Sequence, residues 1–550
     1  MAEKLKVTTP FGVYHYERKT VFLDIVKDFE GRLSSPVVAV KVDNDLKELT
    51  QELNKSCRLE FVDLSSEAGE RIYERSLTFI FIRAAREVLK GCRVTVEHSL
   101  GKGLYCELHH ENKLNKGIVK QIEERMREII SRDEPITKEH IPVQKAIQIF
   151  EADNQMDKVE LLKYRKKNYI NIYTCGWLKS YFYGYLVPST GYLEKFRLHF
   201  YYPGVVLLYP KKENPDVVPD FVDQPKLARI FKEAEEWGEI LNIGHLASLN
   251  DHVLKGRGGE LIRIAEALHE KKIGYIADTI TRNKQNRIIL IAGPSSSGKT
   301  TFAKRLAIHL KVNGLKPISI SLDDYFVNRE DTPRDEEGNP DYEALEAIDI
   351  ELFNDHLVKL LQGKKVEIPF FNFTTGEREY TGNFVRVTED QPIIIEGIHG
   401  LNEQLTPLIP KDMKFKIYVS ALTQLNIDDY NRIPTTDTRI LRRMVRDYKY
   451  RAKSPGETLK LWPLVRRGEE KNIFPHQEDA DIMFNSALVY ELAVLKKYAE
   501  PLLKEVDSSH PEYPKAKMLL EFLEYFIPIE NEDDIPKTSI IREFIGGSCF

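Results

Sequence analysis

Short alternating stretches of hydrophobic and polar residues open the chain, and longer helical patterns follow them. The alternating stretches, at 5–8, 13–16, 37–42 and 58–62, predict strands around a helical segment at 21–29. Amphipathic patterns then predict helices at 68–89 and 116–132, before a tyrosine-rich extended region at 168–209. Strands mixed with helices predict small α+β units for this first part of the chain.

The second part of the chain has a different pattern. A linker-like stretch at 214–220 precedes helical patterns that fill 226–282. From there strands and helices alternate, which is typical of a parallel sheet with crossover helices. We expect a helix at 488–500 that ends near Pro501, and then an acid-rich tail to Phe550. The predicted domains are 1–62, 63–210, a helical connector at 211–282, 283–507 and a tail at 508–550.

Composition and charge narrow the class of protein. A chain of 550 residues predicts about three or four domains. The net charge of -5 gives no overall attraction to nucleic acid or anionic lipid. No apolar run reaches the ~18 residues that span a bilayer, and the first residues lack the apolar stretch of a secretory signal. The five cysteines are scattered without a CxxC pattern, which disfavours a disulfide framework or a cysteine zinc site. We expect a soluble cytoplasmic protein with no membrane partner.

A phosphate-binding loop lies between an apolar strand pattern at 287–292 and a helical pattern at 301–311. This strand–loop–helix order is the structural context in which the motif binds phosphate, so it disfavours a chance match. Glycines let backbone N–H groups surround phosphate oxygens, the lysine reaches the β- and γ-phosphates, and the following threonine binds Mg²⁺. The predicted residues of this site for ATP and Mg²⁺ are Gly293, Pro294, Ser295, Ser296, Ser297, Gly298, Lys299, Thr300 and Thr301.

A candidate catalytic base follows the next predicted strand. Residues 317–322 end in Asp323-Asp324-Tyr325-Phe326, and a carboxylate at the end of a parallel strand faces the same crevice as the phosphate loop. A kinase needs a carboxylate that takes the proton of its acceptor hydroxyl, whereas a hydrolase positions water. The alternative role for Asp323 is to cap the following turn.

The loop, the spacing and the Asp-Asp-Tyr-Phe sequence together resemble the uridine kinase/phosphoribulokinase group of P-loop kinases. The resemblance implies that Asp323 is the base for a nucleoside 5′-hydroxyl. It also implies that the strand at 392–398 brings Glu396 to Mg²⁺, and that 339–342 is the ribose-binding segment. The implied substrate contacts are Tyr325, Asp341, Phe371, Phe373 and Arg443.

The predicted base pocket departs from the family pattern. Uridine kinases carry a Tyr, a Phe and a His where this chain has Phe371, Phe373 and Gly376. The aromatic wall persists without the groups that hydrogen-bond the base edge, and discrimination between bases comes from such polar groups. The sequence therefore leaves the identity of the acceptor open.

Four arginines form one stripe of a predicted helix at 438–451. Arg439, Arg442, Arg443 and Arg446 share a stripe ~100° wide with no acid between them. Such a stripe would repel itself unless an anion neutralised it. The segment resembles the family's lid helix, which implies catalytic roles for Arg443 and Arg446 and ATP contacts for Arg451 and Lys453 at the lid tip. Pro455 and Gly456 would let this lid flex.

The N-terminal half resembles parts of another enzyme. Residues 3–62 resemble a TGS domain, a β-grasp module, and 63–210 resemble the second domain of threonyl-tRNA synthetase. The HxxxH of that domain's editing site is replaced by Arg75-Ser76-Leu77-Thr78-Phe79, and its later Cys and His are missing at 182–188. We expect a binding, regulatory or dimerising role, with a homo-oligomer as one form. Basic residues at 163–167 could contact RNA or form a solvated face.

The sequence thus predicts a multidomain α/β protein with a C-terminal P-loop kinase and an N-terminal β-grasp plus α+β region. The leading function is an ATP-dependent kinase of a nucleoside, similar to uridine/cytidine kinases. One alternative is a kinase of the same fold with a non-nucleoside hydroxyl metabolite as acceptor. The other is an RNA- or tRNA-associated ATP-binding regulatory protein.

Overall fold

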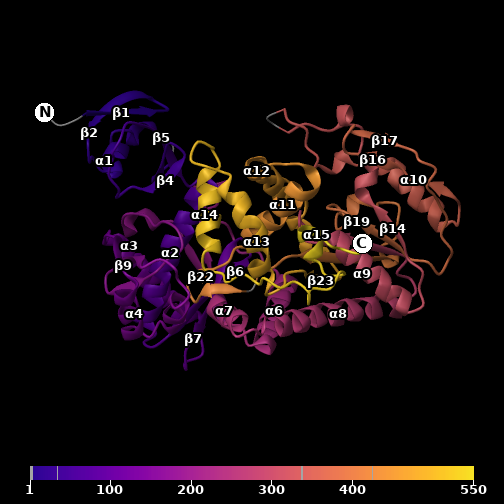
Figure 1. Cartoon of the computed structure of the whole chain (residues 1–550), viewed down its shortest axis with the longest axis horizontal. Coiled ribbons are helices and arrows are strands. Elements are labelled where there is room, and N and C mark those ends of the chain that lie inside the picture. Colours follow the sequence, from indigo (N-terminus) through magenta and orange to yellow (C-terminus); the bar gives the residue numbers. More distant parts are fainter. Residues whose placement is uncertain (1–3, 34, 336–337, 424) are drawn as a thin grey trace.

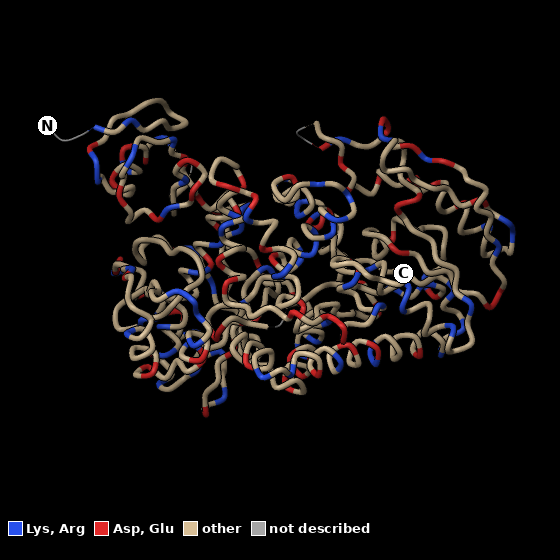
Figure 2. The backbone as a smooth tube through the Cα atoms, viewed as in Figure 1, with Lys and Arg blue, Asp and Glu red and all other residues tan. Residues whose placement is uncertain are grey.

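The computed structural model describes residues 4–33, 35–335, 338–423 and 425–550, so residues 1–3 of the predicted first domain lie outside it. Figure 1 shows the N-terminal half on one side and a sheet with flanking helices on the other, with the long helix α8 running beneath. Acidic and basic residues are interleaved through both halves (Figure 2). The predicted fold class, a multidomain α/β protein, is confirmed. Within the described ranges, no helix combines the length and the hydrophobicity that crossing a membrane requires.

The first unit is a mixed sheet beside one short helix. Its strand order is β2-β1-β5-β3-β4, with β1 and β5 parallel. Alternate residues of β1, including Leu5 and Val7, are buried, as expected for a half-buried strand. The elements are β1 (Lys4–Thr9), β2 (Gly12–Glu17), α1 (Phe22–Lys27), β3 (Val37–Val42), β4 (Asp45–Glu48) and β5 (Cys57–Asp63).

The second unit packs two helices, α2 and α3, around a shared core with a sheet of order β11-β12-β7-β6. A smaller sheet has the order β10-β9-β8. The elements are α2 (Glu67–Val88), β6 (Arg93–Leu100), β7 (Gly103–His109), α3 (Lys116–Ser131), β8 (Thr137–Pro142), α4 (Val143–Ala152), α5 (Met156–Leu162), β9 (Tyr169–Cys175), β10 (Leu178–Ser180), β11 (Arg197–Tyr201) and β12 (Gly204–Leu208).

The predicted connector consists of three helices, α6 (Pro225–Leu241), α7 (Leu246–Leu254) and α8 (Gly258–Arg282). The last of them belongs to the core of the following domain. Buried residues of α8, such as Ile273 and Ile276, pack with Phe302 and with Ile289 of the sheet. The connector is therefore more than a linker, because it covers one face of that sheet.

The C-terminal domain is built on five parallel strands in the order β14-β19-β13-β20-β23. Alternate residues of β13 face opposite sides: Ile288 and Leu290 contact the α10 side, and Ile289 and Ile291 contact α8 and α9. The main elements are β13 (Ile288–Ala292), α9 (Lys299–Val312), β14 (Ile318–Ser321), α10 (Ile350–Leu361), β19 (Ile393–Glu396), β20 (Lys414–Ser420), α11 (Thr435–Arg451), α12 (Pro455–Asn472), β23 (Ile482–Asn485) and α13 (Glu491–Lys504).

The end of the chain folds back onto both halves. The expected helix end near Pro501 is wrong, because α13 continues to Lys504 with the proline inside it. The buried neighbours Leu502 and Leu503 show that packing offsets the hydrogen bond that proline removes. The tail then forms α14 (Tyr513–Leu523), which packs on α13, and α15 (Arg542–Ile545) beside α11.

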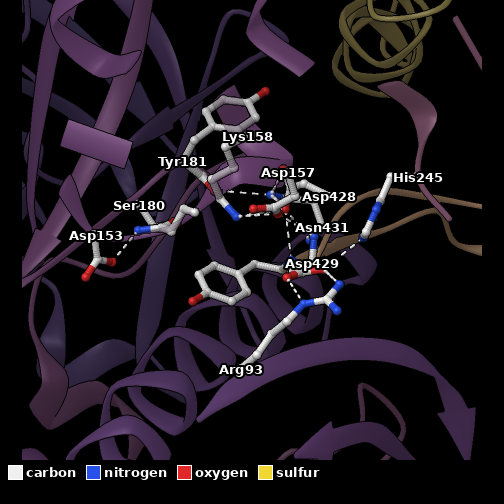
Figure 3. Close-up of polar contacts among 12 residues, drawn as sticks. Arg93, Asp153, Asp157, Lys158, Ser180, Tyr181, His245, Asp428, Asp429 and Asn431 are labelled. Atoms are coloured by element: carbon white, nitrogen blue, oxygen red, sulfur yellow. Dashed lines mark hydrogen bonds and ion pairs between the residues drawn. The ribbon is translucent and has the colours of Figure 1, made fainter. Parts of the chain in front are cut away.

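Several polar contacts join the halves, among them two junctions centred on aspartates. The short hairpin β21 (Asn426–Asp428) and β22 (Asn431–Arg432) carries Asp428, whose carboxylate is 3.1 Å from the buried ammonium of Lys158 on α5. Next to it, Asp429 accepts hydrogen bonds from Arg93 of β6 and pairs with His245 of the connector (Figure 3). Each half therefore supplies charges that the other neutralises.

The second junction lies at the start of α11. The carboxylate of Asp437 accepts hydrogen bonds from both terminal nitrogens of Arg71 on α2, at 3.0 and 2.9 Å. Lys515 of α14 donates to the same carboxylate at 3.0 Å. The first turn of α11 is thus tied to the N-terminal half and to the tail.

Candidate functional site

The phosphate-binding loop connects β13 to α9 at the carboxyl edge of the sheet. At Gly293 a Cβ atom would lie 1.9 Å from the carbonyl oxygen of Val419, so a side chain there would clash with the neighbouring strand β20. Gly298 adopts a left-handed conformation, with φ of 82°, at the N-cap of α9. The loop therefore brings its backbone N–H groups to the start of a helix, where anions bind.

Lys299, Thr300 and Glu396 meet at this edge. The Thr300 hydroxyl donates to Glu396 Oε1 at 3.0 Å, and Lys299 Nζ donates to the carbonyl of Pro294 at 3.2 Å. Burial raises the pKa of Glu396 to about 7, although Lys299 opposes the shift. Burial also lowers the pKa of Lys299. The Thr300 hydroxyl and the Glu396 carboxylate lie side by side, and oxygen atoms of these kinds are the ligands that Mg²⁺ prefers.

Asp323 lies at the end of β14, on the same edge of the sheet. Its side chain is exposed to solvent, yet the surrounding protein desolvates the carboxylate enough to raise the pKa of Asp323. The opposing influences are the positive charges of Lys299, Arg451 and Arg446. The structure therefore brings this predicted base together with the lysine and with two arginines of the predicted lid.

The arginine stripe of α11 is neutralised within the protein, contrary to the expectation from sequence. Arg439 pairs with Glu469 of α12, and Arg442 pairs with Glu491 of α13, all four being buried. Beyond these pairs, the arginines bind the loop. Arg439 Nε donates to Ser295 O at 3.0 Å, Arg442 Nη1 to Ser296 O at 3.3 Å, and Arg443 Nη1 to Ser295 Oγ at 2.7 Å. Helix α11 therefore fixes the phosphate loop.

Arg443, Arg446 and Arg451 surround one buried carboxylate, that of Asp447. The closest nitrogen–oxygen distances are 3.2, 2.8 and 3.7 Å, respectively. Arg451 remains 54% exposed, so it keeps donors for a ligand. Lys453 follows α11, and its backbone N–H donates to Asp447 O at 3.2 Å.

The expected flexible lid tip is instead the ordered start of α12. Ser454 and Glu457 form a reciprocal capping box, and Pro455 occupies the first turn, where proline is favoured. A Cβ at Gly456 would lie 2.5 Å from Nε2 of His510, so this glycine permits close packing against the tail. Pro455 and Gly456 thus lie in the first turn of a capped helix, and the flexibility expected of them stays a prediction.

Two of the predicted substrate contacts lie in the core. The ring of Tyr325 is buried with its hydroxyl 3.1 Å from His356 Nδ1. Phe371 is 3% exposed and packs on Phe326, whereas Phe373 is 62% exposed. Only Phe373 of these aromatic residues is available to stack on a ligand.

Asp341 caps its own turn. Its Oδ1 accepts a hydrogen bond from Glu343 N at 3.1 Å, and the backbone N–H of Asp341 donates to Pro333 O at 2.7 Å. Such an Asx turn uses one of the two carboxylate oxygens, and the contact of Asp341 with a ribose stays a prediction.

Sequence reasoning missed three acids near the loop. Glu469 Oε1 accepts from the Ser295 N–H at 3.0 Å, and Glu543 of the tail accepts from Thr301. Glu343 is partly buried, and burial raises its pKa to about 7, with Glu469 adding to the rise and Lys299 opposing it. None of these acids lies in a recognisable motif. The position of Glu343 two residues beyond the predicted ribose-binding Asp341 was the one available signal.

In the N-terminal half, Arg75 lines two cavities of about 1050 and 1070 Å³. Its guanidinium donates to Tyr185 O at 2.8 Å. Two of the basic residues considered for RNA binding contact the segment just after α14, since Lys167 pairs with Glu524 and Arg165 donates to Tyr525 Oη.

Comparison with known proteins finds different relatives for the C-terminal and N-terminal parts of the chain. Residues 288–493 match the model of the phosphoribulokinase/uridine kinase family. The chain is also 24% identical over 195 residues to the threonine–tRNA ligase of Francisella tularensis subsp. novicida, which is 35% of this chain and 31% of the ligase. The ligase of the F. tularensis strain SCHU S4 matches with the same identity and coverage. The match thus spans about a third of these ligases.

Two solved structures have similar parts. A protein described as a possible uridine kinase from Bacillus stearothermophilus is 21% identical, with a TM-score of 0.27, over 39% of this chain and 98% of its own. D-glycerate 3-kinase from Cryptococcus neoformans is 15% identical, with a TM-score of 0.23, over 49% of this chain and 90% of its own. The chain therefore combines a P-loop domain that matches the phosphoribulokinase/uridine kinase family with an N-terminal region similar to part of threonine–tRNA ligases.

Proposed function

We propose that the C-terminal domain transfers the γ-phosphate of ATP to a hydroxyl group of a nucleoside. The observation that carries this proposal is the meeting of Lys299, the Thr300–Glu396 pair and Asp323 at one edge of the parallel sheet. Among the described residues, no side chain pairs with Asp323 or hydrogen-bonds its carboxylate, so it is available to a substrate. An available carboxylate beside a phosphate-binding lysine is what transfer to an alcohol requires.

In the proposed step, Asp323 takes the proton of the acceptor hydroxyl while the hydroxyl oxygen bonds to the γ-phosphorus. The bond between that phosphorus and the β–γ bridging oxygen breaks, and ADP leaves. Lys299 and the amides of the loop hold the phosphates, and Arg446 and Arg451 offset the negative charge of the group in transfer. Arg443 supports the loop through Ser295.

Mg²⁺, when bound with ATP, would neutralise phosphate charge, and the Thr300 hydroxyl and Glu396 carboxylate would hold it. Nowhere in the described ranges do three or more His, Cys, Asp or Glu side chains gather in a way that could hold a metal ion. Phosphate oxygens and water would complete its coordination, as is usual for Mg²⁺ in kinases.

One observation favours a second candidate, a kinase of the same fold whose acceptor is a non-nucleoside hydroxyl compound. Phe371 packs in the core instead of lining a base pocket, and Gly376 is covered by the Arg329 side chain, 2.6 Å from where a Cβ would lie. Among the predicted aromatic contacts, Phe373 is the one that is exposed, so a smaller acceptor would lose little stacking.

The test is ADP release, measured with uridine, cytidine, sugars, glycerate and other small polyols as acceptors. Asp323→Asn should lower kcat by about 10²–10⁴ while ATP binding is retained. Asp324→Asn, the same change at the neighbouring carboxylate, should keep most of the activity. Undiminished turnover of Asp323→Asn would remove Asp323 as the base. ADP release that needs no acceptor but responds to tRNA would replace the kinase with an RNA-associated ATP-binding regulator.

A further inference from the structure

The last residues of the chain cover the start of α9. Ile540 lies against Gly298, where a Cβ atom would be 2.4 Å from Ile540 Cγ2. Ile540, Ile541 and Phe544 are fully buried, and Lys449 of α11 donates to the carbonyl of Ile545 at 2.6 Å. The backbone of this segment is therefore part of the folded domain and is held directly beside the phosphate loop.

From this segment, Glu543 reaches the first turn of α9. Its Oε2 atom accepts a hydrogen bond from the Thr301 backbone N–H at 3.2 Å and from the Thr301 hydroxyl at 2.7 Å. Thr301 is the third residue of α9, and N–H groups of the first turn have no acceptor within the helix. In a phosphate-binding loop these N–H groups serve the anionic ligand. A carboxylate of the protein thus holds donors that a phosphate would use.

The negative charge of Glu543 also acts on the loop lysine. Burial lowers the pKa of Lys299, and the carboxylates that oppose this shift are Glu396, Asp323, Glu543 and Glu343. Glu396 and Asp323 already have roles in the proposed reaction, and Glu343 lies on the acceptor side. Glu543 is the one that accepts hydrogen bonds from Thr301, in the first turn of the phosphate-binding helix.

We propose that Glu543 is a residue of the donor site that sets the affinity for ATP by competing with a donor phosphate for Thr301. The inference rests on the proposed function only in taking ATP as the donor. An ATP phosphate that reaches Thr301 must displace the carboxylate and meets its charge if the side chain stays near. Because the segment's backbone is buried, rotation of the Glu543 side chain is the motion that frees the site.

Neutral variants of Glu543 should therefore bind ATP more tightly. Competition of this kind acts on bound substrate and transition state alike, so it changes KM and leaves kcat nearly unchanged. We expect at least a tenfold lower Kd for ATP with Mg²⁺, and a similar decrease in KM, in Glu543→Gln. Glu543→Ala, which also removes the hydrogen-bond acceptor, should show the same direction.

The experiment is isothermal titration of the full chain with ATP and Mg²⁺, accompanied by steady-state kinetics. Glu530→Gln is the matched control, because it makes the same change at an exposed acid of the same tail and should leave the Kd unchanged. Circular dichroism establishes that each variant is folded. An unchanged or higher Kd in both Glu543 variants overturns the inference.

The two proposals fail in different ways. Unchanged ATP affinity in the Glu543 variants, with acceptor-dependent ADP release intact, rejects the competition and leaves the kinase standing. Tighter ATP binding without ADP release for any acceptor supports the competition and rejects the kinase. If none of the variants binds ATP, the competition is rejected. Removal of the competing Glu543 carboxylate should have strengthened ATP binding enough to measure it.

Discussion

Replacing Lys158 with methionine should destabilise the junction between the two halves of the chain. The Lys158 and Asp428 side chains are 1% and 0% exposed, with Nζ 3.1 Å from Oδ1. Methionine fills a similar volume but leaves the Asp428 carboxylate buried without its counter-charge. An uncompensated buried charge costs far more than a surface pair that is lost.

The structure sets the size of the effect. Breaking a buried pair costs about 3–5 kcal/mol. The same Asp428 oxygen accepts the N–H groups of Tyr430 and Asn431, at 2.9 and 3.0 Å, and these bonds remain in the variant. We therefore expect the lower end, about 3 kcal/mol, which corresponds to a melting temperature lower by about 6–12 °C for a unit of 150–250 residues.

The effect should depend on pH. Burial raises the pKa of Asp428, and Lys158 opposes that shift, so loss of the lysine raises this pKa further. A carboxyl group whose pKa is higher in the folded state destabilises that state when ionised. This penalty is lost as the pH falls toward the pKa of the unfolded chain. The difference in melting temperature should be largest near pH 8 and smaller near pH 5.

Thermal unfolding followed by circular dichroism measures this difference. Lys120→Met is the matched control, because Lys120 and Glu124 form a pair 3.6 Å apart with side chains 78% and 60% exposed. Exposed pairs contribute about 0–1 kcal/mol, so this control should melt close to the wild type. Lys158→Met with Asp428→Asn should recover part of the loss. The reasoning is refuted if Lys158→Met melts like the wild type at pH 8, or if the double variant is less stable than the single one.

Two further outcomes test the site. The Mg²⁺ concentration for half-maximal ADP formation should rise as the pH falls below about 7, because Glu396, whose pKa burial raises to about 7, then binds a proton instead of the metal. This dependence should disappear in Glu396→Gln, and a flat wild-type profile between pH 6 and 8 would contradict it. Phe371→Ala should cost about 3–5 kcal/mol of stability, since this ring is 3% exposed. Phe373→Ala, at a ring that is 62% exposed, should cost about 0.5 kcal/mol or less and weaken acceptor binding instead. Equal losses of stability in the two variants would show that Phe371 is not a core residue.

The sequence predicted those parts of the site that depend on neighbouring residues. A strand, a glycine-bounded loop and a helix follow one another directly around Lys299, so the pattern specifies the structure locally. Asp323 was predicted because parallel strands end on a common edge, and Glu396 was implied by the resemblance to the uridine kinase/phosphoribulokinase group. These inferences needed no knowledge of how distant segments pack.

The rest depended on contacts between distant segments. Arg439 meets Glu469 across 30 residues, Arg442 meets Glu491 across 49, and Thr301 meets Glu543 across 242. The arginine stripe carried no sign of these partners, which is why it suggested a free anion site. Aromatic residues were ambiguous for a similar reason, since a ring can face a ligand or the core with equal ease.

Helix α11 has a mechanical consequence, because its ends belong to different parts of the molecule. Seventeen helical residues form a rod about 25 Å long. Asp437 in its first turn is held by the N-terminal half, its middle arginines hold the phosphate loop, and the charge of Arg451 at its far end acts on Asp323. Because α11 is rigid and is held at these points, it cannot tilt at one end without displacing the other. A displacement of the N-terminal half would therefore reach the phosphate loop through one stiff element.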